Sequence, residues 1–346
     1  MELSKSDTAG IKGIAILLML WHHVFLNVPE YGALTHSLAI VAKVCVALFL
    51  FVSGYGLTKQ YAGLEKRSVR TTIQFLLRRF VNFFLPFWFC FILVVVVGNL
   101  CGYSFHDAYP ATRNMLKCVI LDFFGQMGYD SYLGPWWFNK MIIQLYLVFP
   151  LLYLMLYNRY MTIVGLTAIV LVQFFAKRIP GNLFFIVEGG LPAFYLGMIS
   201  SRFRVFPEIR KKSHGILLAL VAVFIGIILS LLLLEVIKNP YQAVLIRALL
   251  ALSIIVAYKS FNGNDSHLFE FVGKYATIMY LTHVLFLVLL PQFFYFSKCS
   301  ILIYLFFTIV CLAAAMLIDW LERVTCYNKV RLSIVNHLLC LRSSPY

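Results

Sequence analysis

Residues 11–28 read IKGIAILLMLWHHVFLNV, an apolar stretch about as long as a membrane-spanning helix. It carries Lys12 at one end and His22 and His23 further in. Eleven residues separate Lys12 from His23, and at about 100° a residue they complete three turns plus about 20°, so both side chains share one helix face, about 16 Å apart along the axis. Ionisable groups inside a membrane normally face a protein interior and indicate a pathway or a site. The stretch therefore predicts a membrane helix that carries functional groups.

The composition excludes a soluble protein. The 346 residues are 62% hydrophobic and 12% charged, and the mean hydropathy is +0.88, whereas soluble domains are about 45–50% apolar and about 25% charged. We expect an all-α polytopic bundle that forms a single domain over residues 1–346. The net charge of +15 does not indicate nucleic-acid binding, because the basic residues gather in the short segments between spans, as topology rules require.

Apolar runs predict about ten membrane spans, none of them a cleaved signal peptide. The predicted spans are 11–28, 38–58, 75–100, 139–157, 160–176, 183–200, 215–236, 242–259, 271–290 and 300–321. With the N-terminus inside, most of the 29 Lys and Arg residues fall in the inner segments. Both termini are therefore predicted to be cytoplasmic.

The longest connection, residues 101–138, lies on the predicted outer side. Long structureless loops are uncommon in compact domains, so we expect it to cap the outer face with a short helix near 112–125. The eight cysteines show no CxxC or CxxxC pairing, and most lie in or beside apolar spans. They predict inert buried thiols; we expect no metal site and no cofactor.

The two adjacent histidines point about 100° apart, so only one can share the face of Lys12. A histidine titrates near neutral pH and can take a proton from a hydroxyl and return it to a leaving group, which makes His23 the candidate catalytic residue. The alternative is a hydrogen-bonded histidine that stabilises helix packing, and the residues alone leave both interpretations open.

Basic residues also mark the cytoplasmic start of the third span. Arg78 and Arg79 satisfy ordinary topology rules, but arginine also binds phosphate with two parallel hydrogen bonds. Lys12 is predicted at the same depth, so the three cations are candidates for holding a polyphosphate ligand. Ser53, followed by Gly54, lies near the inner end of the second span, where small residues let helices or a ligand approach closely.

Further polar and aromatic residues gather toward the outer side. Trp136, Trp137, Asn139 and Tyr146 open the fourth span and suit either an interfacial belt or sugar stacking. Glu188 near the sixth span is expected to pair with an outer cation such as Arg247 or Lys43, or to bind an acceptor. His283 in the ninth span and His22 in the first are expected to have structural or supporting roles.

These residues together resemble the acyltransferase-3 family of integral membrane acyltransferases. The family pattern of a basic residue, ten residues and a histidine corresponds to Lys12 through His23. Five further elements are similar to family motifs: Phe51-Val52-Ser53-Gly54-Tyr55; Arg78-Arg79-Phe80 through Pro86-Phe87-Trp88; Trp137-Phe138 with Leu145 through Pro150; Phe194 through Met198; and Gly273-Lys274 with Tyr280-Leu281-Thr282-His283. One departure is Ala9, which stands where family members often carry an acid; Asp7 is nearby.

The resemblance implies an acyl-CoA donor on the cytoplasmic side and a hydroxyl acceptor on a surface glycan, a lipid-linked saccharide or a glycolipid. We therefore expect a bacterial inner-membrane O-acyltransferase, most simply an acetyltransferase, with membrane lipid around it. Lys12, Arg78 and Arg79 would bind the coenzyme A phosphates, Ser53 would line the thioester channel, and His23 would act as general base or briefly carry the acyl group. The alternatives are a transporter or flippase for a lipid-linked saccharide, or a non-catalytic partner in glycan export.

Overall fold

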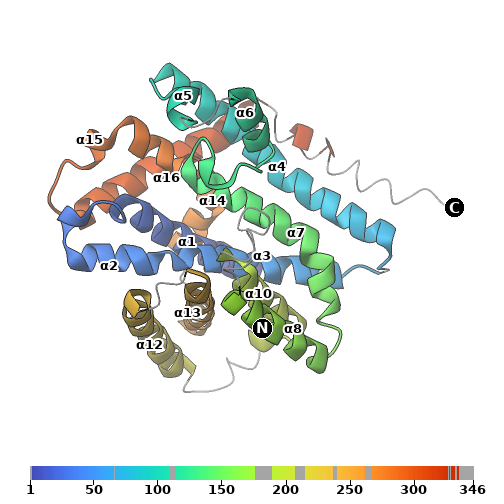
Figure 1. The fold of residues 1–346 in the computed structure, drawn as a ribbon. Coiled ribbons are helices and arrows are strands. Elements are labelled where there is room, and N and C mark those ends of the chain that lie inside the picture. Colours follow the sequence, from blue (N-terminus) through green and yellow to red (C-terminus); the bar gives the residue numbers. More distant parts are fainter. Residues whose placement is uncertain are drawn as a thin grey trace. The chain divides into compact units, whose positions relative to one another are not determined.

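The computed structural model describes residues 2–65, 67–109, 114–175, 189–206, 215–236, 240–261, 267–325, 327, 329–331 and 333–334. All regular elements within these ranges are helices, which confirms the predicted all-α class (Figure 1). The chain forms two compact units, one built from Met1–Leu64 and Val148–Ala276 and the other from Glu65–Leu147 and Thr277–Tyr346.

The first unit is organised around one helix, α3 (Val44–Ala62), which contacts helices from distant parts of the sequence. Its neighbours are α1 (Lys5–Phe25), α10 (Leu191–Arg202) and α13 (Pro240–Phe261). The helices α2 (Ala33–Ala42), α8 (Arg159–Phe175) and α12 (Gly215–Val236) pack outside these. Most α3 side chains are buried, which explains why this segment is apolar around its whole circumference.

The second unit contains the long helix α4 (Val69–Leu100), the outer connection and the C-terminal helix α16 (Ser300–Val324). The outer connection folds into α5 (Phe105–Ala108), α6 (Met115–Phe123) and two 3-10 turns, η2 (Gly128–Asp130) and η3 (Gly134–Trp136). The helix expected near 112–125 is thus confirmed as α6. The short α15 (Pro291–Phe294) contacts α16, while α7 (Trp137–Leu154) and α14 (His267–Leu289) contribute residues to both units.

Seven helices in the described ranges are long and apolar enough to cross a membrane, and each overlaps a predicted span. They are Lys5–Phe25, Ala33–Ala62, Val69–Leu100, Gly134–Leu154, Gln242–Ser260, His267–Leu289 and Ser300–Val324. Two further predicted spans coincide with α8 and α12, and the predicted span 183–200 lies partly outside the described residues. A multi-pass membrane protein is therefore supported; the count of ten and the orientation remain predictions.

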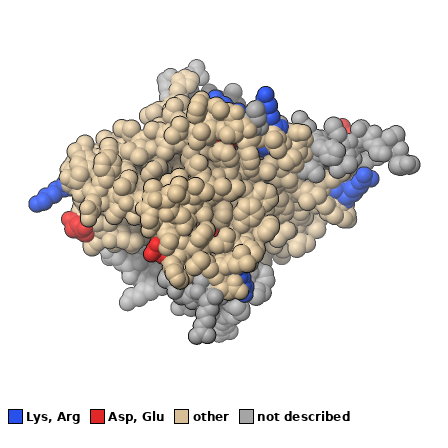
Figure 2. Space-filling model, turned by 90° about the horizontal axis from the view of Figure 1, so that it is seen from above, with Lys and Arg blue, Asp and Glu red and all other residues tan. Residues whose placement is uncertain are grey.

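The surface agrees with a lipid environment. Many large apolar side chains are exposed, such as Ile301, Leu305 and Ile309 on successive turns of α16. The face drawn in Figure 2 carries few Lys, Arg, Asp or Glu residues among those described. Exposed apolar surface of this extent is unfavourable in water and favourable against acyl chains.

Candidate functional site

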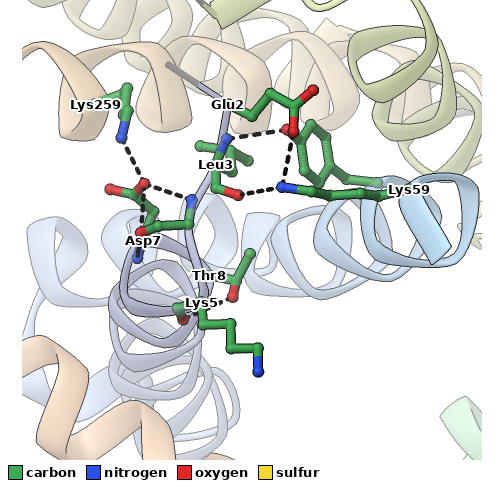
Figure 3. A network of polar contacts seen from close by, with 9 residues as sticks. Glu2, Leu3, Lys5, Asp7, Thr8, Lys59 and Lys259 are labelled. Atoms are coloured by element: carbon green, nitrogen blue, oxygen red, sulfur yellow. Dashed lines mark hydrogen bonds and ion pairs between the residues drawn. The ribbon is translucent and has the colours of Figure 1, made fainter. Parts of the chain in front are cut away.

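The N-terminal end of α1 is held by a polar network within the first unit (Figure 3). Ser4 caps the helix, because its hydroxyl accepts from the Asp7 backbone N–H while the Asp7 carboxylate accepts from the Ser4 backbone N–H. The buried Asp7 carboxylate also lies 2.5 Å from the Lys259 ammonium of α13. A buried carboxylate needs such a partner, so the start of α1 is attached to α13.

The residues before α1 are attached to α3 in the same network. The Tyr55 hydroxyl accepts from the Leu3 backbone N–H at 3.0 Å, and the Lys59 ammonium donates to the Leu3 carbonyl at 3.3 Å. Lys59 also lies 2.9 Å from the Glu2 carboxylate. These contacts define the direction in which α1 leaves its N-terminus, and hence where Lys12 lies within the unit.

Glycines bring α1 into backbone contact with the start of α14. A Cβ added to Gly13 would lie 2.0 Å from the Phe269 carbonyl oxygen, and one added to Gly273 would lie 1.8 Å from the Ala9 carbonyl oxygen. Only glycine leaves room for two helices this close. Lys12, the neighbour of Gly13, is half-buried in the closely packed first half of α1.

The structure distinguishes the two histidines. The His22 ring is buried, and its Nδ1 lies 2.7 Å from the Ala39 carbonyl oxygen of α2, so it donates a hydrogen bond there. Ala39 is one of the last four residues of α2, whose carbonyls have no partner within the helix. His22 therefore caps α2, while His23 is only half-buried and its ring centroid lies 5.0 Å from that of His22.

Two of the motifs meet at a contact between α3 and α10. A Cβ on Gly54 would lie 2.1 Å from the Phe194 carbonyl oxygen, and a Cβ on Gly197 would lie 2.1 Å from the Phe51 carbonyl oxygen. Each glycine thus admits the backbone of the other helix. Ser53 precedes this contact and is half-buried, so tertiary packing joins segments that are about 140 residues apart in the sequence.

Arg78 and Arg79 belong to the second unit, where both are half-buried on α4. The Arg79 guanidinium lies 5.4 Å from the centre of the Phe75 ring, and the Tyr146 side chain is close to it. The Tyr146 ring lies 6.1 Å from that of Phe80. Arg79 and Tyr146 are therefore neighbours, which the sequence did not predict; a shared donor site with Lys12 of the first unit remains a prediction.

The residues at the start of α7 are tied to α14 within the second unit. Trp136 is buried, and its indole N–H donates to the Leu281 carbonyl at 3.0 Å. The Tyr280 hydroxyl lies 3.0 Å from the Pro135 carbonyl and 3.1 Å from Oδ1 of the buried Asn139. Trp137 is half-buried, with its ring 5.4 Å from that of Tyr129. Of the two tryptophans, Trp137 is thus the more accessible to a ligand.

His283 is buried on α14, and its Nδ1 lies 3.1 Å from the Met279 carbonyl and 2.9 Å from the Tyr280 carbonyl of its own helix. Such back-bonding orients the ring; the structural or supporting role expected for His283 stays a prediction. Glu188 lies outside the described residues. No group of three or more His, Cys, Asp or Glu side chains in the described ranges is arranged to hold a metal ion.

Sequence reasoning missed a buried carboxylate in the outer connection. The Asp122 carboxylate accepts from the Tyr109 hydroxyl at 2.8 Å and from the Tyr132 backbone N–H at 2.5 Å. Burial raises the pKa of Asp122 to about 6, and these hydrogen bonds oppose the increase only in part. The carboxylate organises the outer connection. The sequence feature that could have revealed it is a single acidic residue in an otherwise apolar helix.

Comparison with known proteins adds one finding. The family model described as "Acyltransferase domain", that of the acyltransferase-3 family, matches residues 9–320. No curated protein and no solved structure gives a significant match. The matched region covers most of the chain and includes α1, α3 and α10 with the contacts described above. The protein therefore belongs to the acyltransferase-3 family of membrane acyltransferases.

Proposed function

We propose that this protein is an acyl-CoA-dependent O-acyltransferase of the bacterial inner membrane, most simply an O-acetyltransferase. It would move an acyl group from cytoplasmic acyl-CoA to a hydroxyl of a surface glycan, a lipid-linked saccharide or a glycolipid. The observation that carries the proposal is the arrangement of α1 in a chain of this family: His22 caps α2 at 2.7 Å, whereas His23 is half-buried and shares the helix face of Lys12.

In the proposed reaction the acceptor oxygen attacks the thioester carbonyl carbon. His23 removes the hydroxyl proton as the new C–O bond forms. The C–S bond then breaks, and the proton passes to the thiolate, so that the products are the ester and free coenzyme A. In a variant of this scheme His23 itself carries the acyl group between the two substrates.

The remaining residues have supporting roles in the proposal. Lys12, Arg78 and Arg79 bind the phosphates of coenzyme A, for which arginine provides paired donors and lysine a point charge. Ser53 lines the thioester path beside the contact of α3 with α10. Trp137, Asn139 and Tyr146 are on the acceptor path or support it.

The direct test uses membranes incubated with radiolabelled acetyl-CoA. His23→Ala should lower transfer by about 10²–10⁴-fold, the usual contribution of a general base, while the amount of folded protein in the membrane stays the same. His106→Ala, which alters an exposed histidine on α5, is the matched control and should transfer normally. Full activity in His23→Ala would remove this residue from the mechanism.

The same assay separates the proposal from the alternatives. A transporter or flippase does not consume the donor, and a non-catalytic export partner keeps its cellular role when His23 is replaced. Arg78→Ala should raise the acetyl-CoA concentration needed for half-maximal transfer; an unchanged donor dependence would contradict the phosphate role. Mass spectrometry of glycans from a deletion strain and its parent would then identify the transferred group.

A further inference from the structure

A cluster of basic groups lies in the first unit, away from the residues assigned to the donor. Lys43 lies between α2 and α3, and Arg247 lies on α13. Lys43, Arg247 and His22 are within electrostatic range of one another. All three positions lie toward the predicted outer ends of their spans. The spans that contain Lys43 and Arg247 start on the predicted outer side, and His22 is near the end of α1, which finishes on that side.

The cluster contains no compensating acid among the described residues. The acidic side chains described in this unit are Glu2, Asp7, Glu30 and Glu270. Glu2 and Asp7 pair with Lys59 and Lys259 at the opposite end of α1, about 22–26 Å of helix rise from His22. Glu30 is exposed in a turn, and Glu270 follows Phe269, which contacts Gly13.

Local structure does not supply the missing negative charge either. Lys43 follows the C-terminus of α2, whose dipole favours a cation, but it also precedes the N-terminus of α3, whose dipole opposes one. Among the described residues, the other ionisable group near Lys43 and Arg247 is the Cys45 thiol, which is buried and so remains neutral. The Arg247 Nε–H is buried and has no acceptor among the described residues.

Like charges that have no counter-charge among the described residues destabilise a membrane bundle, and such groups normally mark a ligand site. Lys43 and Arg247 are half-buried and not fully enclosed, so part of each side chain can reach a ligand. We infer that Lys43 and Arg247 bind an oxyanion, a phosphate or a carboxylate, presented from the predicted outer side, while the neighbouring His22 keeps its contact with α2. This inference rests on the proposed function only for the source of the anion. The source is either an acidic group of the acceptor saccharide or the phosphate of an outer-leaflet lipid.

The test measures thermal unfolding of the purified full chain in neutral detergent, with no acyl transfer required. Inorganic phosphate or glucuronate should raise the midpoint by several degrees, whereas glucose or matched sodium chloride should not. In Lys43→Met/Arg247→Gln the concentration of phosphate that gives half of this increase should rise about tenfold or more. The matched control is Lys59→Met/Arg204→Gln, which removes two cations already paired with Glu2 and should respond to phosphate as the wild type does.

The direction in which the substitutions shift the unfolding midpoint, measured without added anion, is decisive. Removing uncompensated charges should raise the midpoint of the double variant, and the single variant Arg247→Gln should show the same direction. A lower midpoint without anion would overturn the inference, because it is the result expected if Glu188 already compensates Arg247 or Lys43. An equal phosphate response in the double variant and the wild type, or no response in either, would also overturn it.

Two further comparisons identify the site and the source. Lys12→Met, which alters the predicted donor site, should keep the glucuronate response; its loss would move the anion to the donor site and overturn the inference. Nanodiscs of two lipid compositions distinguish the sources. If the anion comes from a saccharide, glucuronate should stabilise the wild type in phosphatidylcholine nanodiscs. If it comes from a lipid, phosphatidylglycerol nanodiscs should stabilise the wild type without added anion and should not stabilise the double variant. A wild-type protein that binds the anion but transfers no acyl group would refute the proposed function and leave this inference intact.

Discussion

His22 and His23 are neighbours in the sequence with opposite relations to their surroundings. His22 is buried and caps the end of α2, whereas His23 is half-buried. The two neighbours differ because adjacent residues of a helix face directions about 100° apart, and the proposed proton transfer is assigned to His23.

This difference predicts separate effects on stability. His22→Phe keeps the volume of the ring but leaves the Ala39 carbonyl without its donor, so we expect the free energy of unfolding to fall by about 1–3 kcal/mol. His23→Phe, the matched substitution one residue away, should change it less. Thermal unfolding of the two purified variants measures this, and equal losses of stability would contradict the capping role.

Among the helices, α1 and α14 are held together by glycine. Ordinary transmembrane helices interlock side chains, but here the backbones touch at Gly13 and Gly273. The contact places the turn that carries Lys12 against α14, so the position of a proposed ligand-binding residue depends on the absence of a side chain beside it.

Gly13→Ala should therefore be destabilising, although alanine has the higher helix propensity. Its Cβ would lie 2.0 Å from the Phe269 oxygen, and overpacking of this kind costs about 1–3 kcal/mol. Gly56→Ala in α3 is the control, because a Cβ there meets nothing within 4 Å and should add about 0.5–1 kcal/mol of stability. Differential scanning fluorimetry of both variants checks this; a neutral Gly13→Ala would exclude the backbone contact.

The outer connection depends on a single carboxyl group. Because the folded pKa of Asp122 is about 6 and the usual value is 3.8, the folded state binds its proton more tightly than the unfolded state. The stabilisation is fully present below about pH 3.8 and is lost as the pH rises through 6. The outer connection should thus be more stable at pH 5 than at pH 7.5, by about 1 kcal/mol.

Asp122→Asn should remove this pH dependence, because the amide resembles the protonated acid and can still accept a hydrogen bond. The exposed Asp107, whose carboxylate accepts from the backbone N–H of Ser104, the N-cap of α5, provides the control Asp107→Asn, which should retain the pH dependence. Limited proteolysis at both pH values, with cleavage within residues 101–138 mapped by mass spectrometry, measures the opening. A variant at Asp122 with an unchanged pH response would show that another group titrates.

For the molecule in its membrane, the distribution of Lys and Arg predicts that both termini are cytoplasmic. Cys101 and Cys299 are exposed, so the prediction of buried thiols is wrong at these two positions. Cys101 follows α4 and Cys299 precedes α16, and both lie in segments predicted to be outside. A membrane-impermeant maleimide should therefore label both in intact spheroplasts, while the buried Cys45, Cys90 and Cys311 stay unlabelled. Single-cysteine variants separate the sites, and labelling of Cys101 only after lysis would reverse the orientation.

Much of the helical frame could be predicted because apolar runs have clear lengths. The predicted span 215–236 has the bounds of α12, and the predicted outer helix is α6. Two features were not predictable from local patterns. The span 38–58 is longer, from Ala33 to Ala62, and divides at Lys43; α4 starts six residues before its predicted span because Ser68 caps it.

The candidate site was predictable as a set of residue types and less so as a set of contacts. The spacing of Lys12 and His23 follows from helix geometry and needs no coordinates. The capping of α2 by His22, the pairing of Asp7 with Lys259, and the meeting of Gly54 with Gly197 all join residues from different helices. Such partners are chosen by packing, which hydropathy and charge do not encode.

The sequence by itself determined that the chain is a helical membrane protein, and its ordered motifs indicated the family. Apolar length and charge placement act locally on each segment in a bilayer, so they can be assessed one segment at a time. Only the tertiary structure decided that His22 caps α2 and that Lys43 and Arg247 come together. Those outcomes depend on helices that are distant in the chain, and burial of a polar group is settled by the neighbour that satisfies it.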